Sequence, residues 1–128
     1  MPRPLAPHGT ANRWRTGCGC DECYGAHLDD LFLWRRKKAD LRFPAPIRNE
    51  VLRLIRQGYR PVEAARRVGI HVQTVYARSR IDPAWQGRLD GALMAGRRPD
   101  VPHGTPTGYR HFWCVCPECR AAHHKPKE

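Results

Sequence analysis

The sequence predicts a mainly α-helical protein with a central tri-helical domain and one small Cys/His-containing module at each end. Apolar residues recur at helical spacing between residues 47 and 94, which indicates amphipathic helices. The 12 prolines and 11 glycines are concentrated toward the two ends, so little apolar material is left there for a core. The ends therefore need another source of stability, because very small domains rarely fold on a hydrophobic core alone.

Two copies of one motif occupy the ends. The first copy runs from His8 to His27 and the second from His103 to His123. Both read HGT and then CxCxECxxAH, with one residue more between the two parts in the second copy. Disulfides explain this pattern poorly, because cysteines one residue apart are badly placed to bridge each other. The spacing instead predicts a metal site in each copy.

Each copy offers three cysteines and two histidines to an ion such as Zn²⁺, which prefers four tetrahedral ligands. We expect the HGT histidine to be the fourth ligand, since a ligand from the far side of the loop orders the residues between. The histidine four residues after the last cysteine is the alternative, because on a helix it lies one turn along the same face. The predicted ligands are His8, Cys18, Cys20 and Cys23 in one site and His103, Cys114, Cys116 and Cys119 in the other, with His27 and His123 as alternative fourth ligands. Four protein ligands close the coordination sphere, so two structural Zn²⁺ ions are expected.

A helix with a roughly one-sided apolar pattern is expected from Glu22 to about Asp40, ending in four basic residues. The prolines of the segment Phe43–Pro46 should break it. This break separates an N-terminal module, residues 1–43, from a central domain, residues 44–98. The C-terminal module then covers residues 99–128.

Three consecutive helices are expected in the central domain, over residues 47–58, 61–68 and 71–80. Gly69 allows a tight turn between the last two, and Ile70 can fill the corner between them. Val62, Val72, Val75 and Tyr76 are expected to face the core. A further apolar-patterned helix follows Pro83 and contains Leu89, Leu93 and Met94.

The chain has 23 basic and 12 acidic residues, a net charge of +11, which implies a polyanionic partner. A membrane is disfavoured, because no stretch approaches the roughly 18 apolar residues of a span and the N-terminus lacks the apolar run of a signal peptide. We expect a cytoplasmic, nucleoid-associated protein in a bacterial or host cell. No nucleophile is placed beside a base and no glycine-rich phosphate loop occurs, so neither an enzyme nor a small-molecule substrate is expected.

The run EAARRVGIHVQTVYARSR, residues 63–80, resembles the helix-turn-helix of DNA-binding proteins. With the continuation Ile81–Trp85 it looks like the tri-helical regions of transposase-type, resolvase-type and phage small-terminase proteins. The HGT…CxCxxC pattern is similar to a module of short actinobacterial and actinophage proteins. The resemblance implies that a helix starting near His71 enters the major groove of double-stranded DNA. The DNA-binding residues that it implies are His71, Gln73, Thr74, Ala77, Arg78, Arg80, Arg66 and Arg67.

The function implied is that of a DNA-binding protein, a phage or bacterial transcription regulator. A packaging or recombination accessory factor of the small-terminase or excision type is the alternative, and a homodimer that reads a palindrome stays open. A zinc-dependent protein-interaction adaptor is the alternative from another class. RNA binding is a third, in which exposed aromatics stack on unpaired bases. Against it, we expect Trp14, Tyr109 and Trp113 to form the small cores of the metal modules.

Overall fold

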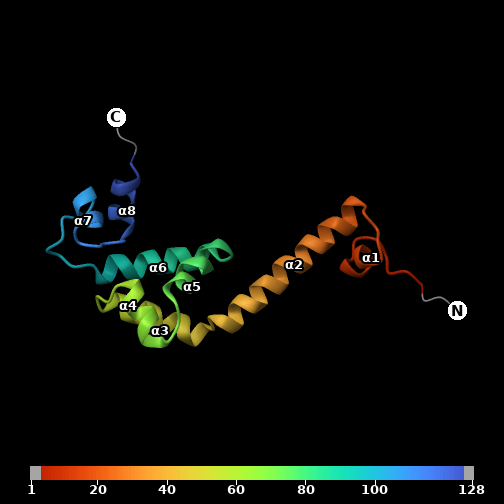
Figure 1. Ribbon diagram of the computed structural model, residues 1–128, viewed down its shortest axis with the longest axis horizontal. Coiled ribbons are helices and arrows are strands. Elements are labelled where there is room, and N and C mark those ends of the chain that lie inside the picture. Colours follow the sequence, from red (N-terminus) through yellow and green to blue (C-terminus); the bar gives the residue numbers. More distant parts are fainter. Residues whose placement is uncertain (1–3, 126–128) are drawn as a thin grey trace. The chain divides into compact units, whose positions relative to one another are not determined.

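A computed structural model describes residues 4–125, which contain helices and no strand (Figure 1). The expected mainly α-helical class is thereby confirmed. The chain divides into two compact units, Met1–Arg42 and Phe43–Glu128. This division adjoins the break expected at Phe43–Pro46. The second unit includes the C-terminal cysteines, and Cys116 and Cys119 share a buried cluster with the helices before them.

The first unit contains a short helix α1, Ala11–Arg15, and a long helix α2, Asp21–Arg42. The side chain of Thr10 caps α1, since its Oγ1 accepts a hydrogen bond from the backbone N–H of Arg13 at 3.2 Å. Helix α2 begins within the cysteine cluster. Two acidic residues in its first turn stabilise it, because their negative charges lie near the positive end of the helix dipole. It then continues for 22 residues.

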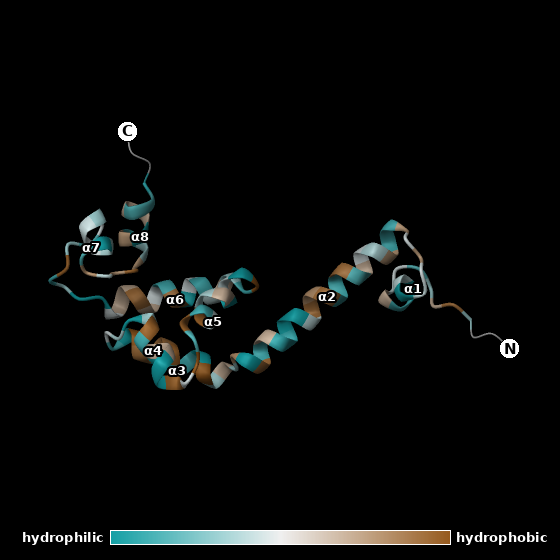
Figure 2. Ribbon diagram, viewed as in Figure 1, coloured by the Kyte–Doolittle hydropathy of each residue, from teal (hydrophilic) through white to brown (hydrophobic). Residues whose placement is uncertain are grey.

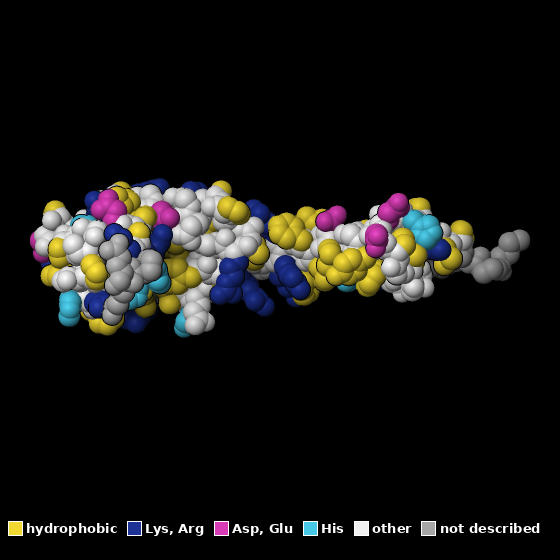
Figure 3. Space-filling view, turned by 90° about the horizontal axis from the view of Figure 1, so that it is seen from above, with side chains coloured by type: hydrophobic (Ala, Val, Ile, Leu, Met, Phe, Trp, Pro, Cys, Tyr) yellow, Lys and Arg dark blue, Asp and Glu magenta, His cyan; other side chains and the backbone are white. Residues whose placement is uncertain are grey.

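Helix α2 does not bury the one-sided apolar face expected from its sequence. Of its residues, all of them described, Cys23 alone is buried, whereas Leu28, Phe32 and Trp34 are 46%, 51% and 56% exposed. Figure 2 shows apolar residues spread along α2, and Figure 3 shows hydrophobic side chains on its surface with Lys and Arg toward its C-terminal half. The apolar residues 31–34 are consecutive and therefore point to different sides of the helix, which corrects the expectation.

The second unit is a run of short helices. Its elements are α3 (Ala45–Arg56), α4 (Pro61–Val68), α5 (Val72–Ala77), the 3₁₀ helix η1 (Arg78–Arg80), α6 (Pro83–Gly96), α7 (Pro106–Arg110) and α8 (Pro117–His124). Helices α3, α4 and α5 lie where the sequence predicts helices, although α5 ends at Ala77 and η1 continues it. Within residues 4–125 no helix combines the length and the apolar character that crossing a membrane requires.

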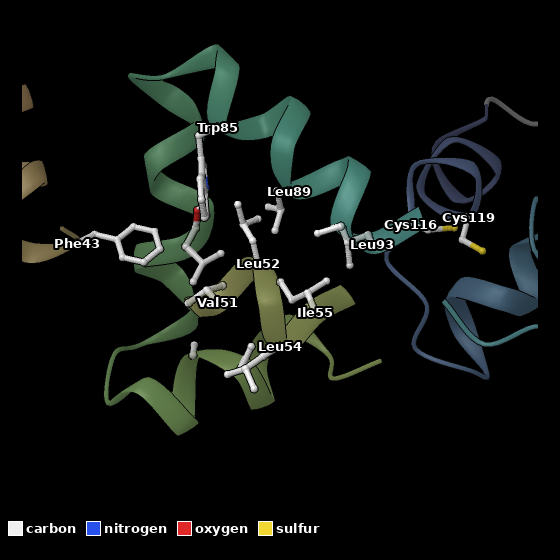
Figure 4. Close-up of a cluster of buried hydrophobic side chains, with 14 residues drawn as sticks. Phe43, Val51, Leu52, Leu54, Ile55, Trp85, Leu89, Leu93, Cys116 and Cys119 are labelled. Carbon is white, nitrogen blue, oxygen red and sulfur yellow. The ribbon is translucent and has the colours of Figure 1, made fainter. Parts of the chain in front are cut away.

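Trp85 on α6 is the largest fully buried side chain in the core of the second unit (Figure 4). Its side chain is 1% exposed, and the edge of the Phe43 ring meets it at a centroid distance of 5.2 Å. Its indole N–H donates to the backbone carbonyl of Val75 at 2.8 Å, which links α6 to α5. The other buried apolar residues of these helices are Val51, Leu52, Leu54, Ile55, Ala64, Ala65, Val75, Leu89, Ala92 and Leu93.

The backbones of α3 and α6 approach each other closely at Gly96. A Cβ atom added there would lie 1.9 Å from the carbonyl oxygen of Ile55 and 3.0 Å from the backbone of Arg56, so only glycine fits. The C-terminal module starts directly after this contact. It is held to α6 by an ion pair between Arg120 and Asp90, with an N–O distance of 2.9 Å.

Candidate metal centres

The first unit brings together one histidine and three cysteines around the start of α2. The Nδ1 atom of His8 lies 3.4 Å from the Sγ atom of Cys18, 3.6 Å from that of Cys20 and 3.5 Å from that of Cys23. Cys20 directly precedes α2, and Cys23 lies in its first turn. All four ligand atoms lie within 4.8 Å of one another.

The second unit repeats this arrangement at the start of α8. The Nδ1 atom of His103 lies 3.3 Å from the Sγ atom of Cys114, 3.7 Å from that of Cys116 and 3.4 Å from that of Cys119. The four ligand atoms again lie within 4.8 Å of one another. These are the two ligand sets predicted with the HGT histidines.

The geometry of both clusters fits a tetrahedral ion. One imidazole nitrogen carries either one proton or one lone pair, so hydrogen bonds cannot explain three sulfurs around it. Bonds of about 2.3 Å to sulfur and about 2.0 Å to nitrogen at tetrahedral angles put sulfur and nitrogen about 3.5 Å apart. The observed distances of 3.3–3.7 Å agree. All six cysteines are free of disulfides, and each cluster could hold one metal ion.

The HGT sequence forms a turn that delivers the histidine. Its glycine adopts a left-handed backbone, with φ of 81° at Gly9 and 78° at Gly104, which glycine tolerates without a steric penalty. The threonine then caps the short helix that follows. Thr105 Oγ1 accepts from the backbone N–H of Gly108 at 3.3 Å, as Thr10 does at the start of α1. The three letters thus specify a ligand, a reversal and an N-cap.

The alternative ligands His27 and His123 lie outside both clusters. The ring of His27 stacks on Trp14 with centroids 4.7 Å apart, and that of His123 stacks on Tyr109 at 3.9 Å. In each copy this contact packs the short helix after HGT against the helix that carries the last cysteine. Trp14 and Tyr109 therefore have the packing role expected of them. Trp113 does not, because it is 67% exposed.

Hydrogen bonds favour a thiolate in each cluster. Hydrogen bonds from the backbone and side chain of Cys20 lower the pKa of Cys18 to about 6. Burial opposes ionisation of Cys116, but hydrogen bonds from the backbone of Cys119 and from the guanidinium of Arg97 lower its pKa to about 7. Burial raises the pKa of Cys114 to about 12. Since metal ligation needs thiolates, one sulfur of each cluster is prepared for it near neutral pH.

Further contacts position the ligands of the second cluster. His103 Nε2 donates to the carbonyl oxygen of Arg98 at 2.6 Å, which leaves the lone pair of Nδ1 for a metal. Arg97 lies 3.7 Å from the Cys116 sulfur and 3.0 Å from a carboxylate oxygen of Glu118. Its charge therefore faces both the thiolate and the helix that follows.

The residues predicted to bind DNA are mostly accessible. His71, Gln73, Ala77, Arg80, Arg66 and Arg67 are exposed, and Thr74 is half-buried. His71 is the N-cap of α5, where its Nδ1 accepts from the backbone N–H of Gln73 at 3.1 Å. Val62 and Tyr76, which we expected to face the core, are 41% and 42% exposed. Tyr76 therefore joins the exposed face of α5, which the sequence pattern missed.

Arg78 is the exception, and its predicted contact with the DNA backbone has to be corrected. Its side chain is 3% exposed, and its guanidinium lies 3.1 Å from the carboxylate of Asp82. Asp82 in turn accepts from the backbone N–H of Trp85 at 3.3 Å and caps α6. Burying a charged guanidinium is costly unless a carboxylate pairs with it. The Arg78–Asp82 pair therefore connects η1 to the start of α6.

Comparisons with models of protein families, with curated proteins and with solved structures find no match for this chain. Function therefore has to be argued from the chemistry and geometry of the sites themselves.

Proposed function

We propose that the protein binds double-stranded DNA through α4 and α5. The observation that carries the proposal is the exposed, polar N-terminal end of α5, with His71 and Gln73, flanked by the exposed cations Arg66, Arg67 and Arg80. Support also comes from the turn between α4 and α5, where Gly69 has a φ of 81°. A short turn of this kind between two helices suits a helix-turn-helix.

In this proposal the first turn of α5 enters the major groove. The amide of Gln73 can pair with the N6 and N7 edge of adenine, and the methyl group of Thr74 can contact a thymine methyl. Arg66, Arg67 and Arg80 contact phosphates, which positions the helix and makes binding depend on salt. Arg78 takes no part, because its guanidinium is buried.

We propose Zn²⁺ as the ion of both clusters. Three thiolates and one imidazole form a donor set that zinc prefers, and the distances suit its tetrahedral geometry. Four protein ligands leave no open position, so the ions are structural and supply folding energy to modules with small cores. The setting proposed is the cytoplasm and nucleoid of a bacterium, in regulation by a phage or its host. Packaging or recombination would use the same DNA contacts.

The test is fluorescence anisotropy of a labelled mixed-sequence duplex titrated with zinc-loaded protein at low and near-physiological salt. We expect binding that weakens steeply as salt rises. After selection of a preferred site, Gln73→Ala should lose the preference, a change of about 1–3 kcal/mol for one bidentate base contact. Gln57→Ala, at an exposed glutamine directly after α3, is the matched control. Negligible duplex binding at low salt would contradict the proposal.

We also propose that two copies of the chain pair through α2. Its first half, residues 21–31, carries four acidic and no basic residues, and its second half, residues 32–42, carries five basic residues and one acidic. An antiparallel pair would set each acidic half against a basic half around Leu28 and Phe32, which lie one turn apart on the same face. The exposure of these two side chains supports this partner. A two-fold pair would present two copies of α5 to a palindromic site.

A further inference from the structure

Trp113 combines a left-handed backbone with an exposed side chain. Its φ is 58°, the one positive value at a non-glycine residue within residues 4–125, and its side chain is 67% exposed. The corresponding residue of the first copy, directly before the first cysteine, is Gly17, with a φ of 104°. Glycine accepts this conformation freely, whereas a tryptophan side chain is strained in it. Neither the backbone nor packing within the chain accounts for a tryptophan at this position, and such strain is often found at functional sites.

The ring of Trp113 and that of Phe112 line a groove that belongs entirely to the second unit. The groove has a volume of about 370 Å³ and is also lined by Tyr59, between α3 and α4, and by Arg98, after α6. Its lining includes two further arginines, Arg60 and Arg97, and the residues Cys114 and Cys116. The volume is that of a site for a small molecule or for one or two nucleotide units.

The lining combines aromatic side chains with arginines whose present carboxylate partners a phosphate can replace. Arg98 is 69% exposed and pairs with Asp100 at 2.6 Å, and Arg60 is 55% exposed and pairs with Glu63 at 3.1 Å. Exposed ion pairs of this kind contribute little, so a phosphate can replace the carboxylate at small cost. Aromatic rings that stack on bases, combined with arginines for the backbone, are how single-stranded nucleic acid is held without sequence preference.

We propose that this groove binds unpaired nucleotides of a single-stranded nucleic acid, with a base stacked on Trp113 and phosphates near Arg60 and Arg98. This activity goes beyond duplex binding by α5 and uses none of its residues. Base stacking would explain why the second copy of the motif has a tryptophan where the first copy has Gly17. An acidic peptide could meet the same arginines, but it would leave the tryptophan without a flat partner.

The test uses the full chain loaded with zinc and a fluorescein-labelled strand of ten thymidines, with anisotropy measured at low salt. Trp113→Gly installs the residue of the first copy. We expect it to weaken single-strand binding roughly 5- to 150-fold, the effect of losing one base–aromatic stack. The thermal unfolding midpoint should stay the same or rise, because the backbone strain is removed. If Trp113 were needed only for structure, its replacement by glycine would lower the unfolding midpoint. Leu5→Ala, at an exposed apolar residue of the first unit, is the control and should bind as the original chain does.

Arg98→Gln is the second variant, because its backbone carbonyl, which holds His103, is unchanged. It should weaken binding and reduce the salt dependence by about one phosphate contact. Single-strand binding that is absent at low salt, or unchanged in Trp113→Gly, overturns the proposal. If Trp113→Gly loses zinc, unchanged binding by Arg98→Gln overturns it instead. Duplex binding, measured on the same samples, reports on the α5 proposal separately.

Discussion

The two candidate metal centres, one in each unit, contain one histidine and three cysteines in the same order along the chain but lie in different surroundings. In the first, His8 and Cys20 are exposed, and the helix that follows leaves most of its residues exposed. In the second, Cys116 and Cys119 are 1% and 0% exposed and belong to the same buried cluster as Trp85 (Figure 4). The ligand geometry is therefore set by the motif, whereas the stability that depends on the ion is set by what packs against it.

The largest expected difference between the two centres comes from removing one ligand of each. Cys119→Ser should release the second ion and destabilise the second unit by several kcal/mol, because the ion's folding energy and a buried sulfur of the core are both lost. Cys23→Ser should release the first ion and leave the second unit folded. Hydrogen exchange of the α3 and α6 amides, with zinc content measured alongside, checks this. Equal loss of protection in both variants would show that the two centres do not differ in this way.

A smaller effect is expected at the contact that precedes the second centre. Gly96→Ala should cost about 1–3 kcal/mol, since its Cβ would meet the Ile55 carbonyl at 1.9 Å and the backbones must separate. Gly91→Ala is the matched control on the same helix, because its Cβ would have no atom within 4 Å. It should stabilise the chain by about 0.5–1 kcal/mol through helix propensity. Thermal unfolding measures both changes.

Gly96→Ala should also weaken zinc binding at the second centre and leave the first centre unaffected. Competition with a chelator would then remove one ion earlier than in the original chain, while the other is unaffected. An unchanged chelator titration would mean that the second cluster holds its ion independently of the α3–α6 contact.

The first unit leaves α2 exposed, and a second copy of the chain would cover this helix. Replacing Lys37 and Lys38 by glutamate reverses two charges of the basic half, which should weaken an antiparallel pair about tenfold or more. The double variant of Arg110 and Lys125 to glutamate changes the net charge equally, outside α2, and should leave pairing intact. Sedimentation equilibrium of the zinc-loaded chain measures both. A chain that is monomeric at all concentrations contradicts the pairing.

Much of the local structure follows from sequence because short-range rules specify it. The HGT turn needs a left-handed glycine and a capping threonine, and both copies supply them directly after the histidine of the cluster. The start of α4 is marked by Pro61 and its end by Gly69, two residues whose backbone preferences match those positions. Such features depend on neighbours within a few residues, so a single sequence contains them.

Features that depend on distant packing could not be predicted in this way. Arg78 follows α5 in a basic stretch and looks like a surface cation, yet Asp82 and the start of α6 enclose it. Trp113 lies beside a cysteine and looks like core material, yet it faces solvent. For Trp113 the repeat itself offers a clue, because the first copy has Gly17 at the same place. The difference between the two copies at this position therefore points to Trp113 as a functional residue.

The smallest expected effect concerns the two histidines that stack on aromatic rings. His27→Ala and His123→Ala should each keep two equivalents of zinc, because neither ring lies in a ligand set. Each should lose about 0.5–1.5 kcal/mol of stability from its aromatic contact. The loss should be larger for His123, whose ring lies closer to its partner and whose module packs on the core of the second unit. Zinc content and thermal unfolding of both variants measure this, and the loss of one equivalent would identify that histidine as a ligand after all.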